Sequence, residues 1–447
     1  MDTPIADFVR RYAAGQPARF HMPGHKGAGP LGCEALDITE VAGADALYEA
    51  EGIIARSEAN AAALFGAAAT CYSTEGSSQC IRAMLALAVL HRRPQAGRPV
   101  ILAARNAHKT LILAAALLNL DVRWLWPEGE DFSLCRCPVS PEQVRRAIRA
   151  LPEPPTAVYV TSPDYLGGQL DIPALAEAAH AAGVPLLVDN AHGAYLRFLP
   201  QSAHPMDLGA DLCCDSAHKT LPVLTGGAYL HISAAAPADF RENARQALAL
   251  FGSTSPSYLI LQSLDLANNA LAGDWPLELA RCAARVERLR TFLTRRGWQV
   301  EDSDPLKLTI ASARSGWEGP ALEAHLRHDG IECEYADPDF LVLMMTPSNT
   351  ESDFSRLESS MSAISPAPPL KRPRLCLPAP EVRRSCREAA FAPRETVPAA
   401  EALGRVLATP TVSCPPAVPV VVSGEVISPQ ALDVFRYYGI SQVTVLR

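Results

Sequence analysis

Lysine is rare in this chain, and it often follows histidine. Of the 40 Lys+Arg residues only five are lysines: Lys26, Lys109, Lys219, Lys307 and Lys371. The first three each come directly after a histidine. An arginine guanidinium stays protonated, whereas a lysine amine can lose its proton and attack a carbonyl. The three His-Lys pairs are therefore candidates for imine chemistry, while the last two lysines are expected at the surface.

A carboxylate and a lysine each follow a short apolar segment. Asp189 comes after the run 184–188, and Lys219 comes thirty residues later, in DSAHKT. Ligands of open α/β sheets bind beyond the carboxyl ends of the strands. In pyridoxal phosphate enzymes an aspartate keeps the pyridine nitrogen protonated and a lysine holds the aldehyde as a Schiff base. The spacing of these two residues favours such a site.

A glycine and hydroxyl loop could hold the phosphate of that cofactor. Gly76, Ser77 and Ser78 lie in the segment 73–79, directly before a helix expected to begin near Ser78. Backbone N–H groups at a helix N-terminus bind phosphate well. Small hydroxylated residues are common at helix starts, so this loop is weak support when taken alone.

Alternating strands and helices must position these residues. Asp171 and Pro173 start, and Gly183 stops, a helix between two β-branched runs, which is the pattern of a βαβ unit. Further alternation predicts an α/β sheet domain. Strands are expected at 99–103, 121–125, 157–161, 184–188 and 227–232, and helices at 59–65, 78–90 and 111–118.

The later part of the chain has a different pattern. An arginine-rich helix is expected at 277–296, followed by strands near 306–311, 330–334 and 340–345. The last segment predicts a helix at 399–407 and a hairpin-like stretch at 415–426. The expected domains are an N-terminal arm (1–33), a major domain (34–265), a small α+β domain (266–363), a proline-rich linker (364–374) and a C-terminal domain (375–447).

Composition narrows the classes of function. The net charge of −8 gives no basic surface for nucleic acid, and no apolar run approaches the roughly 20 residues of a membrane helix. Without a visible signal peptide, the cytoplasm is the expected location. Twelve cysteines without a CxxC pair favour reduced thiols over disulfides or a zinc site. We therefore expect no metal.

Eight blocks, taken in order, resemble the ornithine/lysine/arginine decarboxylases. They are FHMPGHK (20–26), FGA (65–67), EGSS (75–78), RNAHK (105–109), TSPDYLG (161–167), DNAHG (189–193), SAHKTLPVLTGG (216–227) and TSPSY (254–258). The resemblance covers nearly the whole chain and is most specific around Lys219. It implies a pyridoxal phosphate-dependent transferase fold of the aspartate aminotransferase type (fold type I), in a compact form without an N-terminal wing domain.

The resemblance also implies roles for individual residues. Lys219 would form the Schiff base, Asp189 would pair with the pyridinium nitrogen, and His108 would stack on the ring. Ala191 and His192 would lie beside the ring, and Glu425 would bind the distal cationic group of the substrate. Tyr165 is either a core residue or a contact to the cofactor hydroxyl or the substrate. The remaining phosphate ligands would be Ser77, Ser78, Ser216 and His218, with Thr254 and Ser255 reaching across from a neighbouring subunit of a homodimer.

Decarboxylation of arginine, lysine or ornithine is the expected reaction, with arginine first. Lys219 or His218 would return a proton to the substrate Cα. Asn190 and Asp164 depart from the family pattern and put substrate preference in doubt. An aminotransferase, a lyase or an inactive regulatory homologue remain alternatives. The motif Ser216-Ala217-His218-Lys219 also fits a serine acyltransferase, but the partner motifs S-D-N and K-T-G do not occur in the chain.

Overall fold

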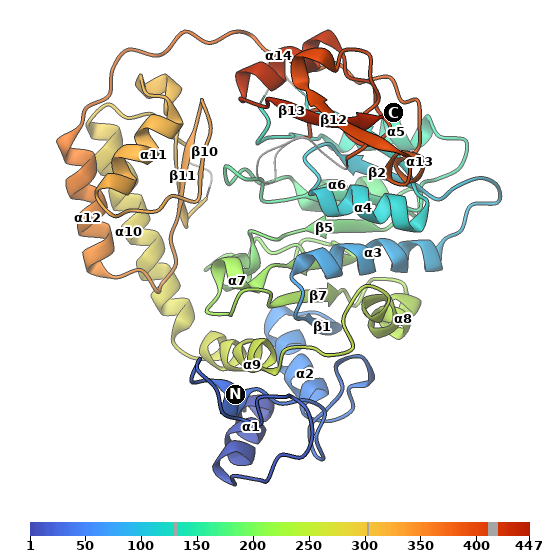
Figure 1. The fold of residues 1–447 in the computed structure, drawn as a ribbon, viewed down its shortest axis with the longest axis vertical. Helices are drawn as coiled ribbons and strands as arrows, with labels where there is room; N and C mark the ends of the chain where they lie inside the picture. Colours follow the sequence, from blue (N-terminus) through green and yellow to red (C-terminus); the bar gives the residue numbers. More distant parts are fainter. Residues whose placement is uncertain (129–132, 302–303, 410–418) are drawn as a thin grey trace. The chain divides into compact units, whose positions relative to one another are not determined.

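The computed structural model describes residues 1–447 except 129–132, 302–303 and 410–418. The chain forms two compact units, and each takes several stretches of sequence. The first unit comprises Met1–Ile101, Val144–Ser162 and Asp171–Pro276. The second comprises Leu102–Gln143, Pro163–Leu170 and Leu277–Arg447. Figure 1 shows the elements of both units in sequence colours.

A mixed sheet forms the core of the first unit. The sheet has seven strands, and those that lie wholly in this unit follow the order β1, β7, β6, β5, β4. Strands β4, β5 and β6 are parallel, whereas β7 runs antiparallel to both β6 and β1. The bounds are β1 Ala69–Ser73, β4 Ala157–Thr161, β5 Leu186–Asp189, β6 Leu212–Asp215 and β7 Ala228–Ile232.

The predicted βαβ unit is confirmed. Strands β4 and β5 pair in parallel, and helix α6, Ile172–His180, connects them. The Asp171 side chain accepts a hydrogen bond from the backbone N–H of Ala174, which caps the helix, and Pro173 lies in its first turn. Gly183 has a φ of 64°, a conformation that glycine adopts without strain. The residues predicted to cap, begin and end this helix therefore do so in the structure.

Helices cover this sheet, and two of them begin at distant carboxylates. Asp265 accepts from the backbone N–H groups of Ile5 and Ala6 at the start of α1, both at 2.9 Å. Asp45 accepts from Gly52 and Ile54 at the start of α2. The helices are α1 Pro4–Ala14, α2 Ile53–Phe65, α3 Ser77–His91, α7 Ala217–Thr220, α8 Ala238–Ala249 and α9 Tyr258–Ala272. The predicted domain boundary at 265 falls inside α9.

The second unit contains a four-stranded antiparallel sheet in the order β10, β11, β9, β8. Three elements, β2, α5 and α10, are continuous between the two units. The strands are β2 Val100–Ala104, β3 Asp121–Leu125, β8 Val300–Glu301, β9 Lys307–Ile310, β10 Tyr335–Ala336 and β11 Leu341–Met344. The helices are α4 Lys109–Leu118, α5 Pro141–Arg149, α10 Trp275–Arg295, α11 Gly319–His328 and α12 Glu351–Ala363.

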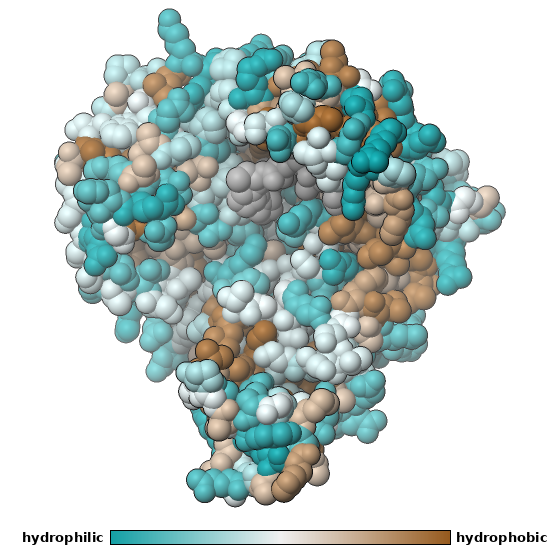
Figure 2. Space-filling model, in the orientation of Figure 1, coloured by the Kyte–Doolittle hydropathy of each residue, from teal (hydrophilic) through white to brown (hydrophobic). Residues whose placement is uncertain are grey.

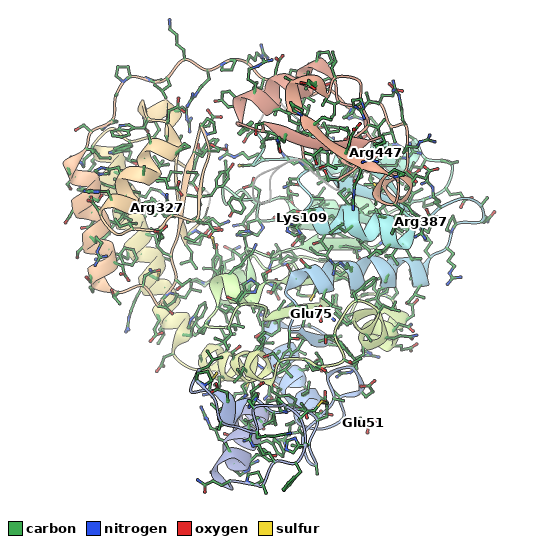
Figure 3. All side chains as sticks on the ribbon, viewed as in Figure 1. Glu51, Glu75, Lys109, Arg327, Arg387 and Arg447 are labelled. Atoms are coloured by element: carbon green, nitrogen blue, oxygen red, sulfur yellow. The ribbon has the colours of Figure 1, made fainter. Side chains whose placement is uncertain are left out.

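The C-terminal part of the second unit pairs two strands antiparallel, β12 (Arg394–Pro398) with β13 (Gln442–Leu446). Its helices are α13 (Cys386–Ala390) and α14 (Pro429–Tyr437). Arg387, labelled in Figure 3, donates to the backbone carbonyls of Ala116 and Leu117 in α4.

Three sequence predictions for the second unit are wrong. The helix expected at 399–407 is only a short 3₁₀ turn, Ala399–Glu401, because the chain turns at Gly404, where φ is 73°. The strand expected at 330–334 is absent among these described residues, and β10 begins at Tyr335 instead. Lys307 is buried rather than exposed, and its Nζ donates to the backbone carbonyl of Asp164 at 3.1 Å. Part of the hairpin-like stretch 415–426 lies outside the described residues.

The surface carries polar and apolar residues together. Figure 2 shows a face of mostly hydrophilic residues with hydrophobic ones gathered in patches. The most exposed large apolar side chains, Phe20, Met22 and Leu31, belong to the predicted N-terminal arm. Among the described helices, none is long and apolar enough to cross a membrane. The described cysteines are free thiols.

Candidate active site

Lys219 lies on α7, the short helix that follows β6. Its Nζ lies 2.9 Å from Nε2 of His192, a residue of the turn that follows β5. Both residues belong to the first unit. The parallel pairing of β5 and β6 places the two turns at the same edge of the sheet. The structure therefore brings two of the sequence-predicted site residues together.

Asp189 is the last residue of β5, and its carboxylate is held at both oxygens. Oδ2 accepts from the Tyr159 hydroxyl at 2.9 Å, and Oδ1 accepts from the backbone N–H of Ala191 at 3.2 Å. Burial raises the pKa of Tyr159 well above its usual value, and the neighbouring carboxylate raises it further. Tyr159 therefore stays protonated and donates, which fixes the orientation of the carboxylate.

The predicted phosphate loop leads into α3. Gly76 caps this helix with a φ of 72°, and its backbone N–H donates to the Gly226 carbonyl at 2.7 Å. The Ser216 hydroxyl donates to the Ser77 hydroxyl at 2.7 Å, which joins this loop to the turn that carries Lys219. Ser77 and Ser78 are the first residues of α3 and are half-buried. Hydroxyl groups and backbone donors thus gather at one helix N-terminus.

His218 lies against the same loop. A Cβ at Gly76 would lie 4.0 Å from the His218 ring, and Nδ1 of His218 lies 3.0 Å from the Gly227 carbonyl. Since a carbonyl can only accept, Nδ1 carries the hydrogen. Burial lowers the pKa of His218 below its usual value, and the Lys219 amine lowers it further. The imidazole is therefore neutral near neutral pH.

The segment with Thr254 and Ser255 is exposed and lies next to the phosphate loop. The backbone N–H of Ser253 donates to Glu75 at 2.5 Å, and Figure 3 shows Glu75 at the start of α3. Thr254 and Ser255 themselves present their side chains to solvent. Their predicted contact with the cofactor of a neighbouring subunit stays a prediction.

Three predicted site residues, His108, Glu425 and Tyr165, belong to the second unit. His108 caps α4: its Nδ1 accepts from the backbone N–H of Thr110 at 3.3 Å. Its stacking on a cofactor ring stays a prediction. Glu425 is only 2% exposed, and Arg105 donates to both of its carboxylate oxygens, at 2.7 and 2.8 Å. Because this pairing occupies the carboxylate, it favours a structural role for Glu425 over contact with the substrate, which stays a prediction.

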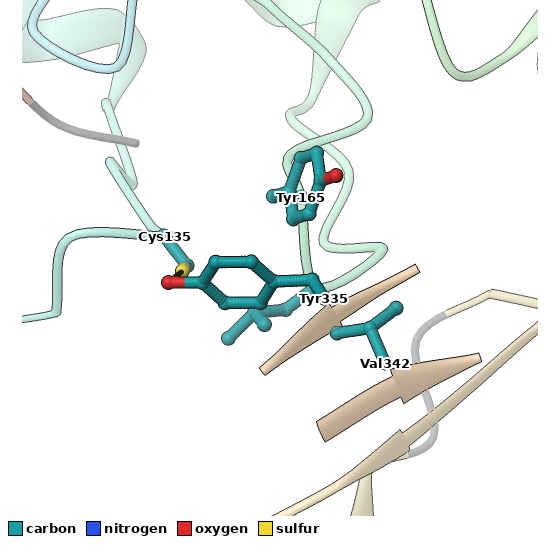
Figure 4. Close-up of a cluster of buried hydrophobic side chains, with 5 residues drawn as sticks. Cys135, Tyr165, Tyr335 and Val342 are labelled. Carbon is teal, nitrogen blue, oxygen red and sulfur yellow. Dashed lines mark hydrogen bonds between the residues drawn. The ribbon is translucent and has the colours of Figure 1, made fainter. Parts of the chain in front are cut away.

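Tyr165 packs in a buried cluster of the second unit (Figure 4). Its ring meets the Tyr335 ring edge-on, with centroids 5.1 Å apart. Its hydroxyl donates to Glu334 at 2.5 Å. These contacts favour a packing role over the contact with a cofactor hydroxyl, which stays a prediction.

The first unit offers the set of groups that pyridoxal phosphate requires. An amine that can form a Schiff base is on Lys219, and a fixed carboxylate is on Asp189. A glycine with positive φ and two hydroxyl groups lie at the N-terminus of α3. A Cβ at Gly226 would lie 2.8 Å from the Thr74 carbonyl, so only glycine lets the two loops approach so closely. The donor set fits this cofactor.

Sequence reasoning missed the residues that support the site from within the sheet. Tyr159 on β4 reaches Asp189, and Asp215 at the end of β6 accepts from Asn190 at 2.6 Å. His204 and His231 both contact Asp215. Asp215 stands four residues before Lys219 in the quoted motif, which is the only local signal for it. The two histidines lie too far away in sequence to be linked to it by spacing.

Comparisons with known proteins agree with this geometry. The family model described as "Orn/Lys/Arg decarboxylase, major domain" matches residues 3–303, and the model of the C-terminal domain matches 376–444. An arginine decarboxylase of Bacillus subtilis is 30% identical over 97% of this chain and 92% of its own length. An arginine decarboxylase of Halalkalibacterium halodurans is 29% identical over 97% of this chain and 93% of its own length.

Solved structures show the same fold. The constitutive lysine decarboxylase of Escherichia coli superposes with a TM-score of 0.80 at 18% identity, covering 100% of this chain and 82% of that one. A serine palmitoyltransferase of Sphingomonas wittichii matches 69% of this chain and 74% of its own, with a TM-score of 0.52 at 15% identity. The fold is that of the fold type I pyridoxal phosphate enzymes, as expected from the sequence. The chain belongs to the ornithine/lysine/arginine decarboxylase family.

Proposed function

We propose that arginine is the preferred substrate of this chain. As a member of its family, the chain decarboxylates a basic L-amino acid with pyridoxal phosphate. The two curated arginine decarboxylases described above support that choice. The observation that carries the chemistry is the Lys219 amine, 2.9 Å from His192, with Asp189 at the end of the adjacent strand. The product would be a polyamine-pathway amine.

Lys219 and His192 together can prepare a neutral amine. A lysine attacks a carbonyl only when its Nζ has lost a proton, and His192 Nε2 is within reach to accept that proton. When bound, the cofactor supplies an electron sink for the pair of electrons that the lost carboxylate leaves behind. The Asp189 carboxylate would keep the pyridine nitrogen protonated. Tyr159 and the backbone of Ala191 hold the two oxygens of this carboxylate in place.

Lys219, rather than His218, is our choice for the group that returns a proton to Cα of the substrate. The neutral His218 ring has only one N–H, and that donates to the Gly227 carbonyl. The Lys219 amine lies 2.9 Å from Nε2 of His192, with which it can exchange a proton. His218 then serves to hold the turn against the phosphate loop.

We also propose a homodimer in the cytoplasm. Phe20 is 97% exposed and Met22 is 71% exposed, and large apolar side chains so exposed favour burial against a partner chain. Free thiols fit a reducing compartment. Light scattering gives the mass in solution. In a mixture of Lys219→Ala chains with Thr254→Ala/Ser255→Ala chains, recovery of activity would show that the two subunits share a site.

The experiment that tests the reaction is an amine assay. Purified protein with added pyridoxal phosphate receives arginine, lysine or ornithine in separate reactions, and chromatography identifies the product amine. We expect agmatine from arginine at the highest rate. Transfer that depends on a keto acid, without amine release, would instead place the chain among aminotransferases. If neither amine release nor keto-acid-dependent transfer is detected, the result would favour an inactive regulatory homologue.

Variants of two lysines sharpen the assay. Lys219→Ala removes the amine that binds the cofactor, so turnover and the visible absorbance of bound cofactor should both disappear. Lys371→Ala is the matched control, because this lysine is exposed in the linker. Normal turnover in the Lys219 variant would refute its assignment.

A further inference from the structure

Asp215 is a fully buried carboxylate with hydrogen-bond donors on both oxygens. Nε2 of His204 lies 2.9 Å and Nε2 of His231 lies 3.2 Å from Oδ2. The Asn190 amide donates to Oδ1 at 2.6 Å. Burial alone would raise the pKa of Asp215, but the two histidines hold it well below its usual range. Asp215 is therefore charged in the folded protein.

These groups form a hydrogen-bonded hub rather than a metal site. The ligand atoms of His204, Asp215 and His231 lie within 4.8 Å of one another, a spacing that could hold a cation. However, the backbone N–H of Met206 donates to Nδ1 of His204 at 3.3 Å. In a neutral ring Nε2 then carries the hydrogen, whereas a metal would need the lone pair at that atom. The His204 hydrogen therefore goes to Asp215.

The hub joins the two turns that carry the site. Asp215 ends β6 and precedes Ser216, which caps the helix with Lys219. Asn190 directly follows Asp189 and precedes the turn with His192. One hydrogen bond between buried side chains, from Asn190 to Asp215, thus connects the turn of the pyridinium partner with the turn of the Schiff-base lysine.

Position 190 is shaped for an amide. A carboxylate there would stand 2.6 Å from the charged Asp215, and two like charges at that distance repel strongly. A Cβ at Gly193 would lie 2.0 Å from Oδ1 of Asn190, so the glycine leaves the space that the amide fills. The residues at 190, 193 and 215 therefore match one another.

We propose that Asp215 is a positioning residue of the cofactor site: held by His204 and His231, it fixes Asn190 and so sets the spacing between Asp189 and Lys219. This inference rests on the proposed roles of those two residues. Asp215 acts through the two turns and not by contact with the substrate.

The test compares two buried aspartates of the first unit. Asp215→Asn replaces an acceptor by a donor that faces the Asn190 amide. Asp265→Asn makes the same chemical change at a fully buried carboxylate that caps α1 and holds Ser57. For each apoprotein, urea unfolding reports stability, and cofactor titration followed by absorbance reports affinity and the spectrum. Both variants should lose stability, but only Asp215→Asn should weaken cofactor binding, by about 10- to 100-fold, and alter the spectrum.

Exchanging the side chains at positions 190 and 215 distinguishes a positioning role from a general loss of structure. Asn190→Asp alone should weaken cofactor binding more than Asp215→Asn, because two carboxylates then meet. In the double variant Asn190→Asp/Asp215→Asn, the amide introduced at 215 can donate to the carboxylate introduced at 190. We expect the double variant to bind the cofactor at least ten times more tightly than Asn190→Asp alone.

Three results would overturn the inference. Cofactor affinity and spectrum unchanged in Asp215→Asn, with stability lost as in Asp265→Asn, would make Asp215 structural only. No recovery in the double variant would remove the link through Asn190. Stoichiometric metal in the wild type, lost in Asp215→Asn, would make the hub a metal site. Failure of the proposed function is distinct: the wild type would bind cofactor normally but release no amine from any basic amino acid.

Discussion

Asp215 in the first unit and Glu425 in the second are both buried carboxylates, but their charges are balanced differently. Asp215 shares its charge among two imidazoles and an amide, which come from three separate stretches of chain. Glu425 depends on one cation, Arg105, whose guanidinium also lies 4.7 and 4.5 Å from the ring centroids of Trp124 and Trp126. The first arrangement uses hydrogen-bond donors that carry no permanent charge, whereas the second depends on a guanidinium that stays protonated.

The two carboxylates also differ in how they hold the neighbouring turns of the chain in position. Arg105 also donates to the carbonyl of Pro419, and Glu425 accepts from the backbone N–H of Val422, so the ion pair joins the end of β2 to the C-terminal segment. Three residues after Arg105 comes His108, the predicted ring-stacking residue. In the second unit the loop before the predicted site residue His108 is thus held by one strong ion pair, whereas in the first unit the turns are joined by a network of hydrogen-bond donors.

The largest effect should come from breaking the ion pair. Glu425→Gln leaves the fully buried Arg105 guanidinium without a carboxylate, and an uncompensated buried charge costs about 3–5 kcal/mol. Urea unfolding followed by tryptophan fluorescence would report it, because Trp124 and Trp126 lie beside Arg105. A loss below about 1 kcal/mol would show that Arg105 is balanced by something other than Glu425.

A smaller loss of stability is expected from Asp215→Asn, about 1.5–3 kcal/mol, which is the value of a hydrogen bond to a charged group. The partners of Asp215 are two imidazoles and an amide rather than a guanidinium, so removing the carboxylate leaves no permanent cation buried without a counterion. Urea unfolding of the apoprotein, carried out next to Glu425→Gln, measures the difference directly. Equal losses in the two variants would contradict the contrast between the two regions.

A third carboxylate, that of the half-buried Asp164, tests a case in which burial outweighs the nearby cations. Burial raises the pKa of Asp164 from 3.8 to about 6, against the opposing influence of Lys307 and Arg136. The folded state therefore keeps this proton while the unfolded chain loses it, and stability falls as pH rises from about 4 to about 6. Above that window, Asp164→Asn should be more stable than wild type by up to about 2 kcal/mol.

The measurement for Asp164 is the unfolding free energy at several pH values. In the wild type the backbone N–H groups of Leu166 and Gly168 donate to Oδ1 of Asp164 at 2.9 and 2.8 Å. The side-chain amide of the Asp164→Asn variant can still accept both hydrogen bonds. The stability difference between variant and wild type should grow only between about pH 4 and 6. A difference that is constant with pH would mean that Asp164 does not titrate there.

The smallest effect is expected at an exposed pair. Glu381 and Arg383 are joined by the same kind of bidentate contact as Glu425 and Arg105, but in solvent. Glu381→Gln should leave the urea midpoint unchanged within error, because water screens the pair and replaces the lost contact. A clear loss would show that geometry rather than burial makes the Glu425 pair strong.

The parts of the fold that the sequence predicted well are those with local signals. The strand at 157–161 and the helix between Asp171 and Gly183 carry their own caps and stops, and the structure confirms them. Lys219 and Asp189 were predicted from strand ends and motif spacing. The structure places Asp189 at the end of β5 and Lys219 on α7, the helix that follows the adjacent strand β6, and their chemical roles stay predictions.

What the sequence did not predict depends on contacts between distant residues. The Asp215 hub needs side chains from positions 190, 204 and 231, and no spacing rule relates them. The start of α2 at Ile53 is set by Asp45, well before the predicted start at 59. Lys307 was predicted at the surface because its hydrogen-bond acceptor, the backbone carbonyl of Asp164, is far away in sequence. Strand β12 was missed because none of its residues is buried and its sequence, RETVP, has no alternation of apolar and polar residues.

The pairing of β1 with β7 has a consequence for how this protein is made. Ala69 pairs with Ile232, so β1 has no partner strand in its sheet until about 160 more residues have been synthesised. At typical rates of translation that takes roughly 10 to 30 s. During this interval the backbone N–H and C=O groups of β1 are available to pair with other nascent chains. We therefore expect the newly made protein to depend on chaperones more than its finished stability suggests.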